Sequence, residues 1–126
     1  MEEIILIFAG FFGVTGVILG AFGAHLLKRK FTEDQLNSFE VGVRYQIYHA
    51  LFLLFLGFHL EFSTLLEKWI GILAIWGVFL FSGSIYGLTI SSAAGRKWRF
   101  LGPITPLGGL CFILSWGLLL YYFITQ

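Results

Sequence analysis

The apolar residues of this chain gather in four long stretches separated by short polar segments. The stretches cover residues 4–27, 41–60, 69–94 and 101–125. Each is long enough to cross a bilayer, because about 20 residues of α-helix, at about 1.5 Å per residue, span the ~30 Å hydrocarbon layer. The pattern therefore predicts an all-α membrane protein with four transmembrane helices, and a single domain over residues 1–126.

The first two stretches each allow a second interpretation. The first resembles a signal peptide in position, but Glu2 and Glu3 precede it where a signal peptide is basic, and its apolar run is longer than usual. We therefore expect a retained span. The second stretch contains Arg44, and it crosses the membrane if this long side chain carries its guanidinium to the headgroups.

An amphipathic segment precedes the second span. Thr32 and Gln35 match a capping box, which predicts that a helix begins there. One face of this helix is then apolar, with Leu36, Phe39, Val43 and Ile47. The pattern predicts an interfacial helix leading into the second span, which we interpret as an anchor in the headgroup layer. A gate or a partner-binding helix is the functional alternative.

The basic residues indicate the orientation of the chain. Seven of the eight lie in or beside the connections at residues 28–40 and 95–99: Lys28, Arg29, Lys30, Arg44, Arg96, Lys97 and Arg99. Since cytoplasmic connections of membrane proteins are enriched in Lys and Arg, both connections are predicted to be cytoplasmic and both termini outside.

Composition agrees with a membrane environment. Hydrophobic residues make up 58% of the chain and charged residues 12%, with a mean hydropathy of +0.88, which excludes an ordinary soluble domain. The net charge of +1 provides no general attraction for nucleic acid. We therefore expect membrane lipids, and no nucleic acid, as partners.

Glycines recur at short intervals on the predicted helices. The candidate packing positions are Gly13, Gly16, Gly20, Gly23, Gly83, Gly87, Gly108 and Gly109. Small residues at this spacing allow helix backbones to approach closely in lipid, so we interpret them as packing surfaces. Contacts within one chain and contacts between protomers of a homo-oligomer both satisfy the pattern. A pore lining or a substrate groove is the alternative.

Polar side chains from all four spans fall near the cytoplasmic side. The candidate cluster contains His25, Tyr45, Gln46, Tyr48, His49, Ser82, Ser84, Tyr86 and Thr105. At about 1.5 Å per residue, all lie within roughly 12 Å of the inner interface. One hypothesis is that they recognise a lipid headgroup, a proton or a small polar molecule, since polar residues at membrane depth are costly and often functional. The other is that these side chains have no specific ligand: Tyr and His suit the headgroup region, and Ser and Thr can bond to carbonyls of their own helix.

The sequence offers few residues that could catalyse a reaction or bind a metal ion. A metal site would rest on two histidines without a nearby intramembrane carboxylate, and a catalytic triad would lack the third group that orients the base. The single Cys111 cannot form an intrachain disulfide. We therefore expect no metal, no cofactor and no enzymatic activity.

Four motifs in order resemble one family. They are GAFGAH at 20–25, YQIYH at 45–49, FSGSIY at 81–86 and ITPLGG at 104–109, followed by Trp116. Together they resemble the small bacterial membrane proteins of YwdK and YgdD type, the domain of unknown function 423 family. The resemblance implies a multi-pass protein of the bacterial cell (inner) membrane, and it implies no activity.

These observations lead to one functional hypothesis and one alternative. The hypothesis is a non-enzymatic, oligomer-forming membrane protein whose cytoplasmic-side cluster binds a lipid headgroup or a partner. The alternative is a small transporter or channel. Because four helices enclose little interior, such a path would lie at an oligomer axis or between protomers.

Overall fold

The computed structural model describes the backbone of residues 1–126 and all side chains apart from that of Ala24. The chain forms α1 (Glu2–Ile18), a π-helical turn η1 (Leu19–Gly23), α2 (Ala24–Leu27), α3 (Glu33–His59), α4 (Leu65–Ala93), a 3-10 turn η2 (Arg99–Leu101) and α5 (Ile104–Thr125). The first three segments form one span, so four helical spans are long and apolar enough to cross a membrane. The predicted all-α fold with four transmembrane helices is confirmed.

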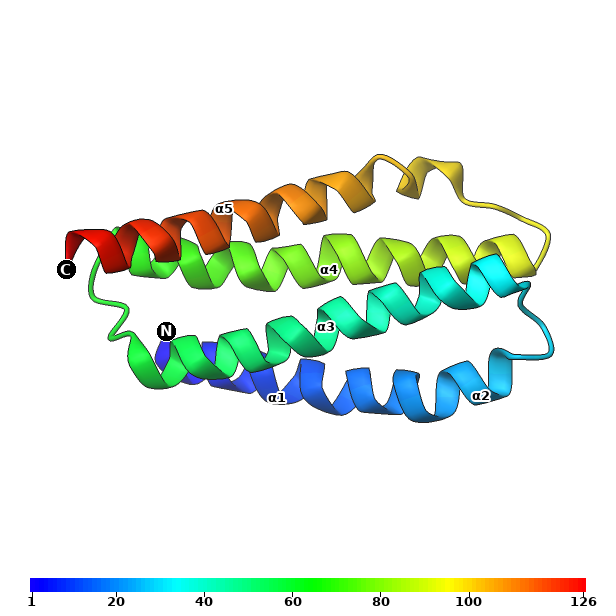
Figure 1. The fold of residues 1–126 in the computed structure, drawn as a ribbon, viewed down its shortest axis with the longest axis horizontal. Helices are drawn as coiled ribbons and strands as arrows, with labels where there is room; N and C mark the ends of the chain where they lie inside the picture. The colour runs from blue at the N-terminus through cyan, green and yellow to red at the C-terminus, as the bar shows by residue number, and fades with distance from the viewer.

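The four spans lie in a row in chain order (Figure 1). The α1 span packs on α3 and also touches α4, where Phe12 contacts Phe79; α3 packs on α4, and α4 packs on α5. Between the described parts of α3 and α5, no Cα atoms come within 8 Å of each other. In the most apolar part of each outer span, 22% of the residues are accordingly buried. The corresponding share is 50% in α3 and in α4.

The row has two distinct ends (Figure 1). Both termini and the connection from α3 to α4 lie at one end. The connection from α2 to α3 and the connection from α4 to η2 lie at the other, and these two connections carry the basic residues noted above. We refer to this second end as the basic end.

Local sequence signals start and stop the two inner helices. The capping box predicted at Thr32 and Gln35 is present at the start of α3, and α4 begins with a second one, at Thr64 and Glu67. Gly95 ends α4 with a φ of 79°, a left-handed conformation that suits glycine. Backbone bonds from Gly95 to Ser92 and from Arg96 to Ser91 complete a Schellman motif.

The amphipathic segment is the first part of α3 and not a separate helix. Its apolar face packs inside the protein, because Phe39 and Val43 form a small core with Phe31. Leu36, Ile47 and Tyr86 pack against the same core. The segment therefore leads into the second span as expected, and its apolar face is covered by protein. At about 1.5 Å per residue, α3 is about 40 Å long, so its first turns extend beyond a ~30 Å hydrocarbon layer.

Glycines produce the closest helix approaches. A Cβ on Gly108 would fall against the backbone of Phe81, so α4 and α5 meet there backbone to backbone. A Cβ on Gly16 would lie 2.9 Å from Ile47, and Cβ atoms on Gly20 and Gly23 would lie 3.0 Å from Val43 and 3.3 Å from Phe39. The π-helical turn at Leu19–Gly23 thus brings glycines of span one against α3.

The other glycines named from the sequence differ in their surroundings. A Cβ on Gly87 would meet Leu101 at 2.5 Å, while one on Gly109 would only reach Phe81 at 4.0 Å. Cβ atoms on Gly13 and Gly83 would meet no described atom within 4 Å. These last two positions therefore do not contribute to the packing described within one chain.

Candidate functional site

The predicted polar cluster is divided among separate hydrogen-bonded groups. The most connected group is centred on Gln46, which is 3% exposed. Its Nε2 donates to the carbonyl of Phe12 at 3.0 Å and to the hydroxyl of Thr15 at 2.7 Å. Its Oε1 accepts from the Tyr86 hydroxyl at 2.6 Å. One amide side chain therefore links α1, α3 and α4, and both of its ends are satisfied.

Thr15 was missed in the sequence analysis. It is the only hydroxyl residue between positions 4 and 27, and this isolation was the available signal. Its own hydroxyl donates to the Phe11 carbonyl at 2.8 Å, so it accepts from Gln46 while remaining bonded to its own helix.

His49 belongs to a second group, formed with α5. Its Nδ1 lies 2.8 Å from the carbonyl of Tyr45, and its Nε2 lies 3.2 Å from Nε1 of Trp116. A carbonyl only accepts and an indole N–H only donates, so this geometry fits the neutral imidazole that carries its proton on Nδ1. The ring also stacks on Phe112, with centroids 3.6 Å apart. Trp116, noted earlier only in a motif, is thus the partner of His49.

Serine hydroxyls also join neighbouring helices. Ser82 donates to the carbonyl of Gly42 on α3 at 2.6 Å, and Ser84 bonds to the hydroxyl of Thr105 on α5. Ser115, which was not among the predicted site residues, donates to the carbonyl of Ile70 at 2.7 Å. These hydroxyls connect helices and do not contact a histidine.

Two members of the predicted cluster lie apart from these groups. His25 is exposed on α2, and Tyr48 is 54% exposed on α3. The structure therefore brings together Gln46 with Tyr86, Tyr45 with His49, and Ser84 with Thr105. It does not gather all nine residues around one cavity.

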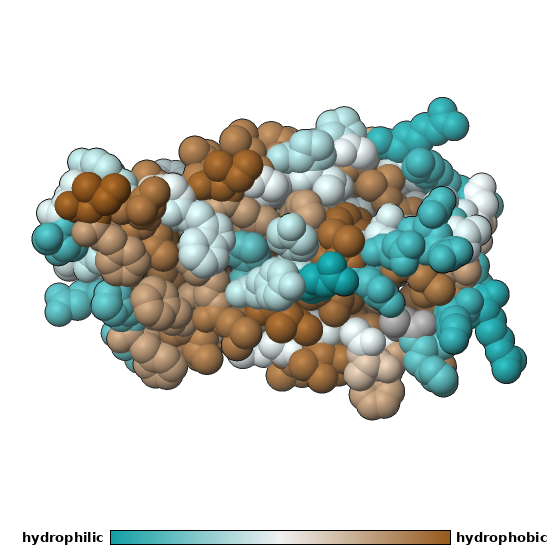
Figure 2. Space-filling view, in the orientation of Figure 1, coloured by the Kyte–Doolittle hydropathy of each residue, from teal (hydrophilic) through white to brown (hydrophobic). Residues whose placement is uncertain are grey.

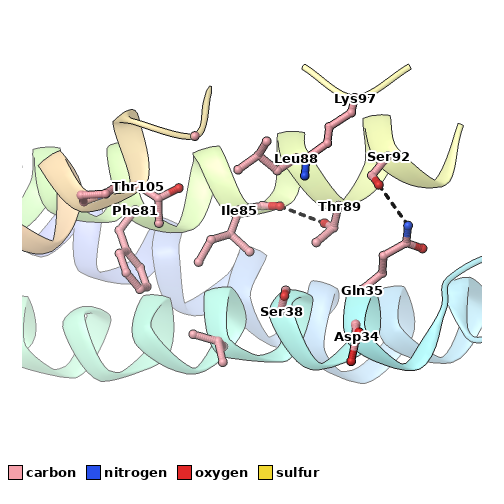
Figure 3. Close-up of a pocket in the computed structure, with 13 residues that line it drawn as sticks. Asp34, Gln35, Ser38, Phe81, Ile85, Leu88, Thr89, Ser92, Lys97 and Thr105 are labelled. Atoms are coloured by element: carbon pink, nitrogen blue, oxygen red, sulfur yellow. Dashed lines mark hydrogen bonds between the residues drawn. The ribbon is translucent and has the colours of Figure 1, made fainter. Parts of the chain in front are cut away.

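A cleft at the basic end offers a different candidate site (Figure 3). It has a volume of about 640 Å³ and is lined by residues of α3, α4, the connection after α4 and the start of α5. Its lining consists of Asp34, Gln35, Ser38, Val41, Phe81, Ile85, Leu88, Thr89, Ser92, Lys97, Gly102, Thr105 and Pro106. Thr105 is the only member of the predicted polar cluster in this lining.

The cleft changes in character along its length. Figure 3 shows Asp34, Gln35, Ser92 and Lys97 towards the basic end, and Phe81 and Thr105 at the opposite end of the view. Nε2 of Gln35 donates to the hydroxyl of Ser92 at 3.1 Å, which ties α3 to α4 at the polar end. We call this polar end the mouth of the cleft.

A second cavity adjoins the cleft at Phe81. Its volume is about 520 Å³, and its wall is mostly aromatic: Tyr45, His49, Phe81, Gly109, Phe112, Ile113 and Trp116. Phe81 lines both cavities. Both cavities lie between α3 and α5, the first with the polar mouth and the second with a mostly aromatic wall, and we refer to the two together as the α3–α5 groove.

The molecular surface shows a similar change from polar side chains at the basic end to apolar side chains further in. Figure 2 shows hydrophilic side chains concentrated at the ends of the molecule, above all at the basic end, and a largely hydrophobic middle. A hydrophilic patch also extends from the basic end towards the middle of this face. The mouth of the groove therefore lies at the hydrophilic, basic end of the molecule.

Comparison with known proteins identifies relatives of similar length. Residues 19–109 match the family described as "Protein of unknown function (DUF423)". A UPF0382 membrane protein of Staphylococcus epidermidis is 35% identical over 114 residues, which cover 90% of this chain and 89% of the relative. The UPF0382 inner membrane protein YgdD of Escherichia coli is 36% identical over 120 residues, covering 94% and 88%. No solved structure matches the chain.

Proposed function

The chain belongs to the DUF423 family of membrane proteins, as its motifs indicated, and from its structure we propose that it is a non-enzymatic protein that binds a membrane lipid. The observation that supports this function is the α3–α5 groove, whose polar mouth and aromatic inner part follow the polarity of a lipid. Binding sites for small molecules are typically apolar clefts with a few polar groups that fix orientation.

The dimensions of the groove fit this proposal. Asp34 at the mouth and His49 at the inner end are 15 residues apart on α3, which corresponds to about 22 Å along the helix. Half of a hydrocarbon core is about 15 Å thick. A lipid headgroup at the mouth would therefore lie in the headgroup layer while its chain followed the groove into one leaflet.

The location and orientation are part of the proposal. The E. coli relative is named an inner membrane protein, and we infer the bacterial cell (inner) membrane for this chain. Because Lys and Arg concentrate in cytoplasmic connections, the basic end faces the cytoplasm and both termini lie outside. The groove then opens to the inner leaflet.

Two observations support a binding role over catalysis. The hydroxyls of Ser82 and Ser84 bond to a carbonyl and to Thr105, while Nε2 of His49 accepts from Trp116. In this arrangement the histidine activates neither serine, whereas nucleophilic catalysis requires the nucleophile and base within hydrogen-bond reach.

Homo-oligomerisation is a further part of the proposed function. Gly10 on α1 and Gly83 on α4 are exposed, and a Cβ on either would meet no described atom within 4 Å. Small residues on a lipid-facing surface allow a second helix to approach closely. The row of helices also leaves α1 and α5 largely uncovered by the chain itself.

Native mass spectrometry of the full chain, released from nanodiscs of phosphatidylethanolamine and phosphatidylglycerol, tests both lipid binding and oligomerisation. We expect a defined oligomer that retains lipid. Val41→Phe should reduce the retained lipid severalfold, because Val41 lines the cleft and a larger side chain would occupy it. Leu51→Phe is the matched control, since Leu51 is an exposed residue of the same helix outside both cavities.

Each outcome of this experiment has a definite meaning. Equal lipid retention by Val41→Phe and Leu51→Phe would contradict binding in the groove. A monomer at every protein concentration would contradict oligomerisation.

Transport through a path between protomers is the second candidate function. The bonded groups around Gln46 and His49 favour such a path over one through the chain, because a path inside the chain would have to break them. Flux of a polar dye or ion across proteoliposomes, absent from protein-free vesicles, would favour this function over simple lipid binding.

A further inference from the structure

The mouth of the cleft carries opposite charges on opposite walls. Asp34 belongs to the first turn of α3, and Lys97 belongs to the connection between α4 and η2. Both line the cleft and both are exposed to solvent.

The two charges also differ in depth. In Figure 3 the side chain of Lys97 runs back from the connection towards Leu88, so that its ammonium lies further from the basic end than Asp34 does. Asp34 lies in the first turn of α3, on the other side of the cleft and nearer the basic end. From the inner end outwards, a bound molecule would therefore meet an apolar wall, then a positive group, then a negative group.

The order of these groups matches the order of groups in one kind of phospholipid. Resting on the lipid binding proposed above, we propose that the groove selects a phospholipid with an amine-bearing zwitterionic headgroup, such as phosphatidylethanolamine, with its phosphate at Lys97 and its amine at Asp34. The phosphate of such a lipid is attached to the glycerol, next to the chains, and the amine is at the far end. The lipid thus presents its apolar, negative and positive parts in the order that the groove complements.

The same charges disfavour an anionic headgroup. Phosphatidylglycerol would satisfy Lys97 through its phosphate but would offer no positive group to Asp34. Charged groups facing each other across a binding site contribute to specificity mainly by rejecting the wrong partner. An exposed ion pair contributes at most about 1 kcal/mol, which corresponds to a preference of about fivefold.

A structural role for Asp34 has to be separated from this one. A carboxylate in the first turn of a helix also interacts favourably with the helix dipole. Glu33 provides the matched control, because it lies in the same turn of α3 and does not line the cleft. For Lys97 the matched control is Arg96, which precedes it in the same connection and also does not line the cleft.

The test is a lipid competition read by native mass spectrometry. The full chain in mild detergent is incubated with equimolar dioleoyl phosphatidylethanolamine and dioleoyl phosphatidylglycerol, and the bound lipids are counted by mass. Wild type should retain more phosphatidylethanolamine than phosphatidylglycerol, up to about fivefold more. Asp34→Asn should bring the ratio close to one, whereas Glu33→Gln should leave it unchanged. Lys97→Gln should reduce retention of both lipids, and Arg96→Gln should not.

The possible failures are distinguishable. Wild type that retains both lipids equally, or prefers phosphatidylglycerol, would overturn the headgroup selectivity while leaving lipid binding intact, and so would an unchanged ratio in Asp34→Asn. The wild-type ratio decides the matter even if a variant fails to fold. Wild type that retains neither lipid would overturn lipid binding itself.

Discussion

The hydroxyl of Tyr86 donates a hydrogen bond of 2.6 Å to Oε1 of Gln46, and through it α4 is joined to α3. The same amide donates from its other end to Phe12 and Thr15 of α1. Gln46 of α3 is thus bonded to both α1 and α4.

Tyr86→Phe should therefore destabilise the protein. The substitution keeps the ring but leaves Oε1 of buried Gln46 without its donor, and we expect a loss of about 1 kcal/mol in the free energy of unfolding. Unfolding in mixed detergent, followed by circular dichroism, measures this. Tyr48→Phe is the control, because Tyr48 is exposed on α3. Equal stability of the two variants would contradict a bonding role for Tyr86.

Gly108→Val should separate α4 from α5. Its side chain would collide with the backbone of Phe81, which cannot move as a side chain can. Overpacking of this kind typically costs about 1–3 kcal/mol. Gly117→Val on the same helix is the control, because a Cβ there would meet no described atom within 4 Å. The same unfolding assay should show a loss of stability for Gly108→Val alone.

His49 should be found as the neutral tautomer protonated on Nδ1. The carbonyl of Tyr45 requires a donor at Nδ1, and the indole of Trp116 requires an acceptor at Nε2. Nitrogen-15 NMR of histidine-labelled protein distinguishes the tautomers directly. In Trp116→Phe the Nε2 resonance of His49 should shift, because its donor is gone. A proton found on Nε2 in the wild type would refute this geometry.

Glu67 should contribute to stability through the start of α4. Its Oε2 accepts from the Thr64 backbone N–H at 2.9 Å, and from the hydroxyls of Thr64 and Ser63. Glu67→Ala removes these bonds, and loss of a helix cap costs about 1 kcal/mol. Glu61→Ala should have a smaller effect, because Glu61 is exposed in the preceding connection. Similar losses in both variants would show that the capping box is unimportant.

Much of the architecture follows from the sequence alone. In a bilayer every backbone polar group must find a partner within the protein, so each long apolar stretch becomes a helix, and four such stretches mean four spans. The capping box at Thr32 and Gln35 likewise needs only local bonds, and it was predicted correctly. The family could also be recognised from the motifs, since these are properties of the sequence itself.

The candidate site depended on the tertiary structure. Position along a helix gives depth in the membrane, so the sequence indicated which polar groups share a level. It does not tell which way each group faces once neighbouring helices are in place. Tyr48 and His49 are adjacent in sequence, yet Tyr48 is exposed while His49 is buried against α5.

The groove could be found only once the lateral order of the helices was known. It exists because α4 separates α3 from α5, and this brings Asp34 and Lys97, far apart in the chain, to the same mouth. Local preferences and hydrophobicity decide that a segment is a helix and that it spans the membrane. The lateral order of the helices is decided by interhelical contacts such as Gly108 against Phe81, which form only when the whole chain is assembled.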